Sequence, residues 1–326
     1  MKAVVCETWR EWDRMELREV PAPVPRPGQV RLRVEAVGVS FAAQLVVQGK
    51  YQRKPPLPFS PGTEVVGTVL EGPIPAGTRV FAALDWGGLA EEAVCDAIHC
   101  MPIPDGVPDP LAGVAMAISY PTAASALMWR GKVGPGDWVL VHGAAGGVGL
   151  AGLEVAKALG CRVVARAAAA KHALLHERGA DVVLDSALPF REAVRAATGG
   201  VACVLDILGG DSFDDSLRCL GDGGTLVTLG YVEGRIPQVP ANILLLKNIA
   251  VAGLNWGTYI GWSPGDGREG HAPRVRALWG QLSAWWAEGK LRPAVHARFP
   301  LARFREAMAE VAARRSAGRV IITPSG

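Results

Sequence analysis

Short apolar runs alternate with amphipathic stretches through the middle of the 326-residue chain. The runs predict strands at residues 137–142, 162–165, 181–184, 202–206, 224–229 and 249–254. Helices are expected between them, at 147–159, 171–178, 190–197 and 212–220. Buried strands that alternate with helices and glycine-rich turns are typical of a parallel sheet covered on both faces. The pattern therefore predicts a six-stranded, doubly wound domain.

The flanking regions have a different pattern. Before about residue 115, Pro and Gly are frequent, and β-like runs occur at 30–37, 65–70 and 79–84. Strands with this spacing of turn residues indicate an irregular β domain or barrel. After the alternation stops, a long helix is expected near 274–288, helical structure at 301–315 and a last strand at 319–323. We therefore expect an α/β protein with two domains of different architecture.

Composition and charge narrow the function classes. Lys and Arg number 34 and Asp and Glu 31, so the formal charge is 34 − 31 = +3, which favours neither nucleic acid nor an anionic membrane as a partner. No apolar run reaches about 18 residues, and the first residues lack the apolar stretch of a secretory signal. We expect a soluble, cytoplasmic protein with no nucleic-acid or membrane partner.

One cysteine-containing cluster suggests a metal. It consists of Cys95, His99 and Cys100. Adjacent ligand residues chelate one ion poorly, and no second ligand pair stands nearby in the sequence. No metal site is expected.

A glycine-rich turn is the strongest chemical motif. Gly143, Gly146 and Gly149 follow the first strand of the alternating region and open a helix. In this strand–turn–helix context, backbone N–H groups approach a pyrophosphate at the helix N-terminus. We therefore expect Gly146, Gly147 and Val148 to bind a dinucleotide. The alternative is a glycine-rich turn without this role.

The end of the second strand indicates which dinucleotide. An NAD site usually carries an acidic residue there, but residues 163–171 contain none. Arg166 and Lys171 occupy this region, and two cations suit a 2′-phosphate. NADPH is therefore the expected cofactor. Alternatively, both cations are solvated surface residues.

Two further strand ends contribute candidates. Gly209 follows the fourth strand, and Gly230 and Tyr231 follow the fifth. Open α/β sheets bind ligands beyond the carboxyl ends of their strands. These three residues are expected at the rim of the cofactor site.

The order of several motifs resembles a known family. They are residues 38–41, 49–51, 61–67, 120–123, 142–149, 244–248 and 256–257. The chain is similar to the zinc-independent quinone oxidoreductases of the medium-chain dehydrogenase/reductase superfamily, the group that includes ζ-crystallin. The resemblance implies a GroES-like irregular β-barrel catalytic domain, formed by residues 1–118 and 261–326. A six-stranded Rossmann NADPH-binding domain, residues 119–260, would be inserted between its two parts.

The resemblance also implies a chemistry. Zinc-dependent relatives carry metal ligands in two stretches, which here read Gly38-Val-Ser40 and Gly62-Thr-Glu64 and lack them. Without a Lewis acid, an unactivated alcohol is a poor substrate. Hydride transfer from NADPH to a quinone or an α,β-unsaturated carbonyl is therefore expected, as the reaction of a metal-free enzyme.

The resemblance assigns roles to individual residues. Tyr51 would polarise or protonate the acceptor, or else serve as a packing ring. Ser40 would hydrogen-bond the substrate or cofactor amide, or else close a turn. Thr122 would lie beside the nicotinamide, or else cap a helix. Asn255, next to the last motif, is a further candidate cofactor-binding residue.

The sequence also suggests an oligomeric state and leaves two alternative functions. A homodimer is expected through strand 249–254, because pairing with its own copy would cover the outer edge of the sheet. Two other functions stay open. One is an enoyl-thioester or 2-alkenal reductase, and the other is a non-catalytic NADPH-binding protein.

Overall fold

The chain folds into two compact units. The computed structural model describes residues 1–263 and 265–324. The first unit, here called the barrel unit, comprises Met1–Ile118, Gly257–Gly289 and Pro293–Gly326. The second, called the parallel-sheet unit, comprises Ser119–Trp256 and Lys290–Arg292. The second boundary thus lies at 256, where the sequence suggested 260.

The parallel-sheet unit contains the predicted six-stranded sheet, which is confirmed. Its strands run parallel in the order β10-β9-β8-β11-β12-β13. They are β8 (Trp138–His142), β9 (Arg162–Ala167), β10 (Val182–Asp185), β11 (Val201–Asp206), β12 (Leu220–Thr228) and β13 (Ala250–Gly253). The strand order reverses between β8 and β11. In doubly wound sheets, ligands bind at the carboxyl ends of the strands beside such a reversal.

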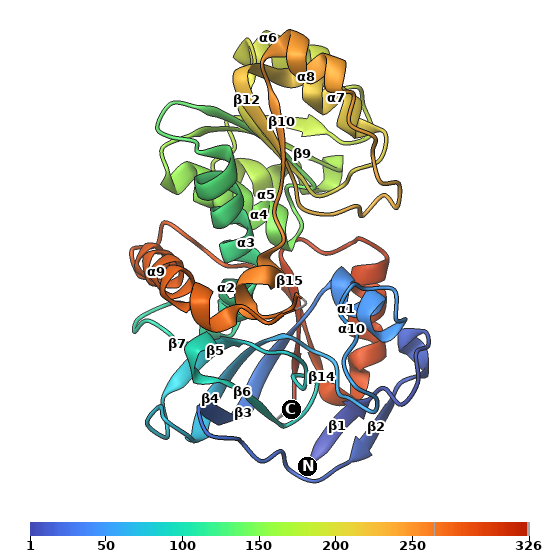
Figure 1. Cartoon of the computed structure of the whole chain (residues 1–326), viewed down its shortest axis with the longest axis vertical. Coiled ribbons are helices and arrows are strands. Elements are labelled where there is room, and N and C mark those ends of the chain that lie inside the picture. Colours follow the sequence, from blue (N-terminus) through green and yellow to red (C-terminus); the bar gives the residue numbers. More distant parts are fainter. Residues whose placement is uncertain (264, 325–326) are drawn as a thin grey trace. The chain divides into compact units, whose positions relative to one another are not determined.

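Helices cover both faces of this sheet. Figure 1 shows α3, α4 and α5 on one face and α6, α7 and α8 on the other. They are α3 (Ser119–Ser125), α4 (Gly147–Ala158), α5 (His172–Glu177), α6 (Arg191–Thr198), α7 (Ser212–Cys219) and α8 (Ala241–Lys247). A π-helical segment, Ala126–Gly131, continues α3, and a short 3₁₀ turn lies at Ala169–Lys171. Arg292 joins this unit because its backbone N–H donates to the buried carboxylate of Glu154, at 2.7 Å.

The barrel unit is built from strands at both ends of the chain. A two-stranded sheet contains β1 (Lys2–Val5) and β2 (Glu16–Glu19). The larger sheet contains β3 (Gln29–Val39), β4 (Glu64–Glu71), β5 (Arg79–Ala83), β6 (Glu92–Asp96), β7 (Cys100–Pro102), β14 (Val295–Pro300) and β15 (Arg319–Thr323). The long strand β3 pairs with β4, with β6 and with β15. The last strand of the chain therefore completes the sheet that the first part begins.

The helices of the barrel unit are few. They are α1 (Phe41–Val47), α2 (Val114–Ala117), α9 (Arg268–Ala287) and α10 (Phe304–Ala312), with short turns at Trp12–Arg14, Ala97–His99, Pro110–Gly113, Trp256–Ile260 and Leu301–Arg303. Helix α9 begins at Arg268, earlier than the expected 274, and continues through Pro273. The Arg268 guanidinium is paired with Asp85 and Asp96, which fixes the start of the helix.

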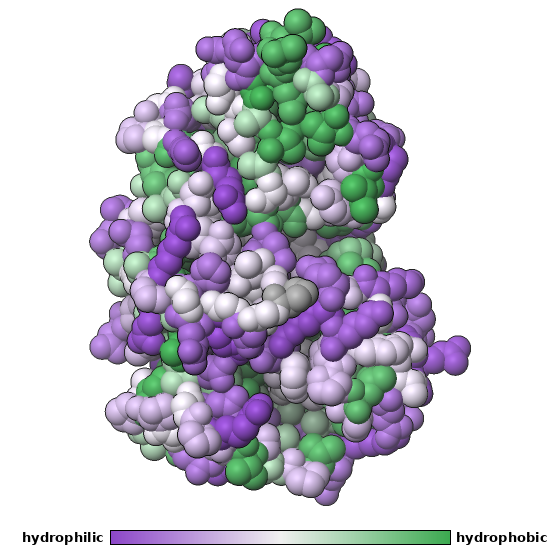
Figure 2. All heavy atoms as spheres, in the orientation of Figure 1, coloured by the Kyte–Doolittle hydropathy of each residue, from purple (hydrophilic) through white to green (hydrophobic). Residues whose placement is uncertain are grey.

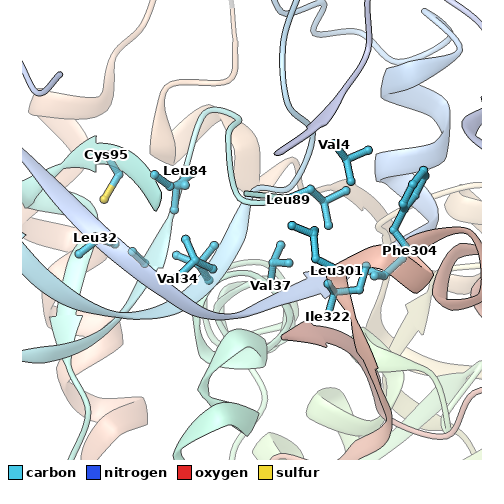
Figure 3. Close-up of a cluster of buried hydrophobic side chains, with 14 of the residues drawn as sticks. Val4, Leu32, Val34, Val37, Leu84, Leu89, Cys95, Leu301, Phe304 and Ile322 are labelled. Carbon is cyan, nitrogen blue, oxygen red and sulfur yellow. The ribbon is translucent and has the colours of Figure 1, made fainter. Parts of the chain in front are cut away.

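The core of the barrel unit combines residues from both ends of the chain. Figure 3 shows Val34 and Val37 of β3 together with Leu301, Phe304 and Ile322. All five are at most 4% exposed. Burial of this kind stabilises the unit only when the N-terminal and C-terminal segments are both present.

The length and hydropathy of the helices bear on whether the chain could cross a membrane. Among the residues that the structure describes, no single helix is long and apolar enough to cross a bilayer. One bent pair of helical segments, Pro110–Ala117 with Ser119–Gly131, has the length and composition for it.

Candidate functional site

The glycine turn lies between β8 and α4, as the motif predicted. Gly143 has a positive φ of 58°, and Gly146 is the extended residue that precedes the helix. A Cβ on Gly149 would lie 2.7 Å from the backbone carbon of Gly143 and closer still to its oxygen. Within the described chain, no side chain caps this helix. The N–H groups of its first residues, Gly147 and Val148 among them, are therefore available to an anion.

Arg166 lies at the carboxyl end of β9, where the sequence placed it. Its side chain is buried, with the residue 9% exposed, and its Nη2 donates to the carbonyl of Ser186 at 2.7 Å. The alternative that Arg166 is a solvated surface residue is therefore wrong. The guanidinium also lies over the ring of Phe190, 4.4 Å from its centroid. Burial lowers the pKa of this guanidinium. Lys171 ends the short turn after the same strand and is half-buried.

The loops after β11 and β12 are joined to each other. The backbone N–H of Glu233 donates to the carbonyl of Leu208 at 3.0 Å. Gly209 has a φ of 63°, and a Cβ there would lie 2.9 Å from the ring of Tyr231. Gly230 lies close to this contact, because a Cβ on it would be 3.4 Å from the carbonyl of Ile207. The three predicted rim residues are thus close together.

Asp206 organises this rim and was missed at the sequence level. Its Oδ1 accepts from the backbone N–H groups of Leu208 and Gly209, each at 3.0 Å. An Asp side chain often accepts from the backbone N–H groups two and three residues later and so forms a turn. The Asp at the start of the Asp-Ile-Leu-Gly segment is the local signal that could have identified this role. Burial raises the pKa of the carboxyl group, and the two N–H donors oppose the rise.

Two polar atoms at the same edge lack partners among the described residues. They are Oδ2 of Asp206 and Oγ1 of Thr228, both inaccessible. Asp206 and Thr228 are directly paired across β11 and β12, so their side chains share one face of the sheet. Buried polar atoms normally have hydrogen-bond partners. This edge therefore fits a ligand that carries hydroxyl or amide groups.

The remaining candidates of this unit lie around the edge. Asn255 is exposed and follows β13. Thr122 lies inside α3, so the alternative that it caps a helix is wrong. Helix α3 packs against α4, whose N-terminus begins at the glycine turn.

Ser40 and Tyr51 belong to the barrel unit and flank α1. The Ser40 Oγ accepts from the N–H of Ala43 at 3.2 Å and caps the helix. Tyr51 follows the helix and is half-buried, and burial raises the pKa of its hydroxyl.

The loop after Tyr51 is fixed by Arg53, which the sequence did not single out. Its guanidinium pairs with Asp85 at 2.9 Å. It also lies near two indole rings, 5.3 Å from the centroid of Trp86 and 5.8 Å from that of Trp262. No local sequence signal predicts this arrangement, because the partners are distant in the chain.

Within 1–263 and 265–324, no group of three His, Cys, Asp or Glu side chains could hold a metal ion. Cys95 and Cys100 do lie together, with their sulfurs 3.1 Å apart.

Comparison with known proteins places the chain in a family. Residues 26–105 match the alcohol dehydrogenase GroES-like domain, and residues 147–267 match the zinc-binding dehydrogenase domain. Quinone oxidoreductase-like protein 2 of Rattus norvegicus is 36% identical over 333 residues, which cover 99% of this chain and 92% of that protein.

Solved structures agree with the sequence relatives. The quinone oxidoreductase of Thermus thermophilus, determined alone and with NADPH, is 34% identical with a TM-score of 0.86, covering 99% of this chain and 100% of that one. A mycobacterial protein in complex with NADPH is 31% identical with a TM-score of 0.88 and the same coverage. The chain therefore belongs to the quinone oxidoreductase-like proteins of the medium-chain dehydrogenase/reductase superfamily.

Proposed function

We propose that this protein is an NADPH-dependent oxidoreductase that reduces quinones or α,β-unsaturated carbonyl compounds without a metal ion. The observation that carries the proposal is the carboxyl edge of the parallel sheet. It combines a helix N-terminus that no described side chain caps, one cation in β9 and one in the turn that follows it, and a polar rim. Relatives solved with NADPH have the same fold.

Each part of this edge has a role in binding. The N–H groups of Gly147 and Val148 hold the pyrophosphate. Gly146 lies beside it, because its own N–H donates to the carbonyl of Gly143 at 2.9 Å. Arg166 and Lys171 hold the 2′-phosphate. The remaining contacts come from the rim and its neighbours, namely Gly209, Gly230, Tyr231, Thr122 and Asn255.

NADPH supplies the hydride, and the barrel unit orients the acceptor. A tyrosine hydroxyl is protonated at neutral pH, and burial raises the pKa of Tyr51 further. The Tyr51 hydroxyl can therefore donate to a carbonyl oxygen on which negative charge develops. The Ser40 oxygen already accepts from Ala43, which leaves its own proton for a second donor bond. A quinone or enone stabilises much of the developing charge itself, so these donors suffice without a Lewis acid.

Steady-state assays of NADPH oxidation test the function. A panel of quinones should be compared with 2-alkenals, next to a direct NADPH-binding measurement. Turnover of either class supports the proposal and names the preferred acceptor. Binding without turnover of any acceptor contradicts it and favours a non-catalytic role.

The cofactor preference has its own test. Lys171→Ala should raise the KM for NADPH roughly tenfold, the loss of one phosphate contact, and leave the KM for NADH unchanged. Arg162→Ala is the matched control, because Arg162 begins β9 and lies at the opposite end of the strand. Equal KM values of the native protein for both cofactors would refute the preference.

Metal independence is tested by chelation. Ser40 and Thr63 stand in the two stretches where zinc-dependent relatives carry ligands. Prolonged chelation should leave kcat unchanged. Stoichiometric zinc that is lost together with activity would contradict the proposal.

We further propose a homodimer that forms through β13. This strand lies at the end of the sheet, and the neighbouring helix α8 exposes Leu245 and Leu246 by 78% and 76%. Figure 2 shows apolar side chains gathered over the region of α8. Light scattering should report a dimer that Leu246→Glu disrupts, whereas Leu188→Glu, 60% exposed elsewhere in the unit, leaves it intact. A native monomer refutes this.

A further inference from the structure

Two buried thiols of the barrel unit face each other. The sulfurs of Cys95 and Cys100 are 3.1 Å apart, and the residues are 4% and 1% exposed. Figure 3 shows Cys95 in the same buried cluster as Leu32 and Leu84. Thiols elsewhere in the chain have different neighbours: those of Cys6 and Cys161 contact backbone carbonyls, at 3.4 and 3.3 Å.

The strand order explains why the two sulfurs meet. Strand β6 pairs with β3, and β7 pairs with β5, so the two lie at opposite ends of the path β6-β3-β4-β5-β7. The chain joins β6 directly to β7 through the turn Ala97–His99. Cys95 and Cys100 therefore lie on either side of the seam between β6 and β7, which do not pair with each other within the described chain.

The turn between the cysteines is fixed from outside. The Oδ1 of Asp96 accepts from the side chain of Gln29 at 3.0 Å, and its other oxygen binds Arg268. The thiol of Cys100 contacts the carbonyl of Asp96 at 3.7 Å. These contacts hold the sulfurs together, and an S–S bond of about 2.05 Å requires an approach of only about 1 Å.

We propose that Cys95 and Cys100 form an oxidative modification site, which a hydroperoxide converts to an intrachain disulfide. The first thiol takes the distal oxygen of the hydroperoxide, whose O–O bond breaks, giving a sulfenic acid and an alcohol, or water from hydrogen peroxide. The second sulfur then attacks the sulfenic sulfur. The S–S bond forms, the S–O bond breaks and water leaves.

The disulfide would close the seam covalently. It would join β6 to β7 without changing the strand pairings on either side, because each cysteine keeps its own backbone partner, Val30 for Cys95 and Ala82 for Cys100. The neighbouring thiol of Cys100 and burial raise the pKa of Cys95, so the Cys95 thiol stays protonated until an oxidant reaches it.

Peptide mapping of the native protein tests the site directly. The fully reduced chain is treated with hydrogen peroxide, unfolded, alkylated and cleaved before aspartate residues. Cleavage between Cys95 and Asp96 separates the two cysteines, so the fragments stay joined only if the disulfide has formed. We expect a joined pair that is about 2 Da lighter than the two free thiols, four alkylated cysteines, and complete reversal by dithiothreitol.

Matched variants define the pair. Cys95→Ser and Cys100→Ser should each abolish the joined fragments, and Cys6→Ser should leave them unchanged. Six alkylated cysteines after oxidation, or bridging of a different pair, would overturn the proposal. Because the mapping uses the unmutated protein, that result holds even if a serine variant fails to fold.

Discussion

Replacing Gly149 by alanine tests whether the glycine turn depends on close backbone packing. The new Cβ would lie 2.7 Å from the carbonyl carbon of Gly143 and 2.8 Å from the Cα of Ala144. Both atoms belong to the backbone of the turn itself. The methyl group can therefore be accommodated only if the turn moves away from the helix.

The magnitude follows from two opposing effects. Alanine gains about 0.5–1 kcal/mol over glycine in a helix. Overpacking costs about 1–3 kcal/mol, and a contact with backbone lies at the upper end of this range because no rotamer change relieves it. We expect a net loss of about 2 kcal/mol in the free energy of unfolding. A displaced turn should also weaken NADPH binding by at least about tenfold, or 1.4 kcal/mol.

Two other glycines provide controls. A Cβ on Gly152 would meet the side-chain tip of Leu205 at 2.7 Å, and this tip can move, so a smaller loss is expected. A Cβ on Gly280, in α9, would meet nothing within 4 Å. Gly280→Ala should therefore stabilise the protein by about 0.5–1 kcal/mol.

The assay combines urea unfolding with a fluorescence titration of NADPH. The expected order of stability is Gly280→Ala, then the native protein, then Gly152→Ala, then Gly149→Ala. A Gly149→Ala variant with native stability and native NADPH affinity would refute the packing argument.

Three further predictions concern Asp206, His142 and Tyr51. Asp206→Asn keeps an oxygen for both backbone donors and should change stability by less than about 1 kcal/mol, whereas Asp206→Ala should cost about 2–3 kcal/mol in urea unfolding. Since burial raises the Asp206 pKa above 3.8, native stability should fall as pH rises through the raised value, and the asparagine variant should lack this fall. Burial lowers the pKa of His142 from 6.5 to about 3, so between these pH values the imidazole is protonated in the unfolded chain and neutral in the native state. Stability should therefore be lost as pH falls from 6.5 towards 3, by on the order of 5 kcal/mol, and His142→Gln should flatten this part of the pH profile. Tyr51→Phe should lower kcat about tenfold, or 1.4 kcal/mol, with the KM for NADPH unchanged, and an unaltered kcat across several acceptors would leave Tyr51 a packing residue.

The parallel sheet was predictable because its strands are buried on both faces and their sequences are continuously apolar. The glycine turn was predictable because spacing and context together specify a backbone geometry. The strand order was not predictable from these patterns, because it depends on the side of the sheet to which each helical connection returns the chain. Arg166 has one feature that the sequence predicts and another that it does not. Its position at the end of β9 follows from counting, but its contacts with Ser186 and Phe190 depend on how a loop packs over the strand.

The site in the barrel unit was less accessible to sequence reasoning. Arg53 and Arg268 share Asp85, although these residues lie far apart in the chain. Such a network arises only after the loops meet, so no local pattern contains it. The true start of α9 at Arg268 was missed for the same reason, because the ion pair of Arg268 with Asp96 joins residues distant in the chain.

The pairing of β3 with β15 has a consequence for synthesis of the protein. All six strands of the parallel sheet have left the ribosome once Gly253 has emerged. In contrast, β3 has no pairing partner on one edge until β15, Arg319–Thr323, has been synthesised. During that interval Val37–Val39 presents an unpaired strand edge, and the core lacks Ile322. Unpaired edges and exposed apolar surface favour aggregation. The nascent chain is therefore most vulnerable late in translation, and loss of a few C-terminal residues would extend that vulnerable state indefinitely.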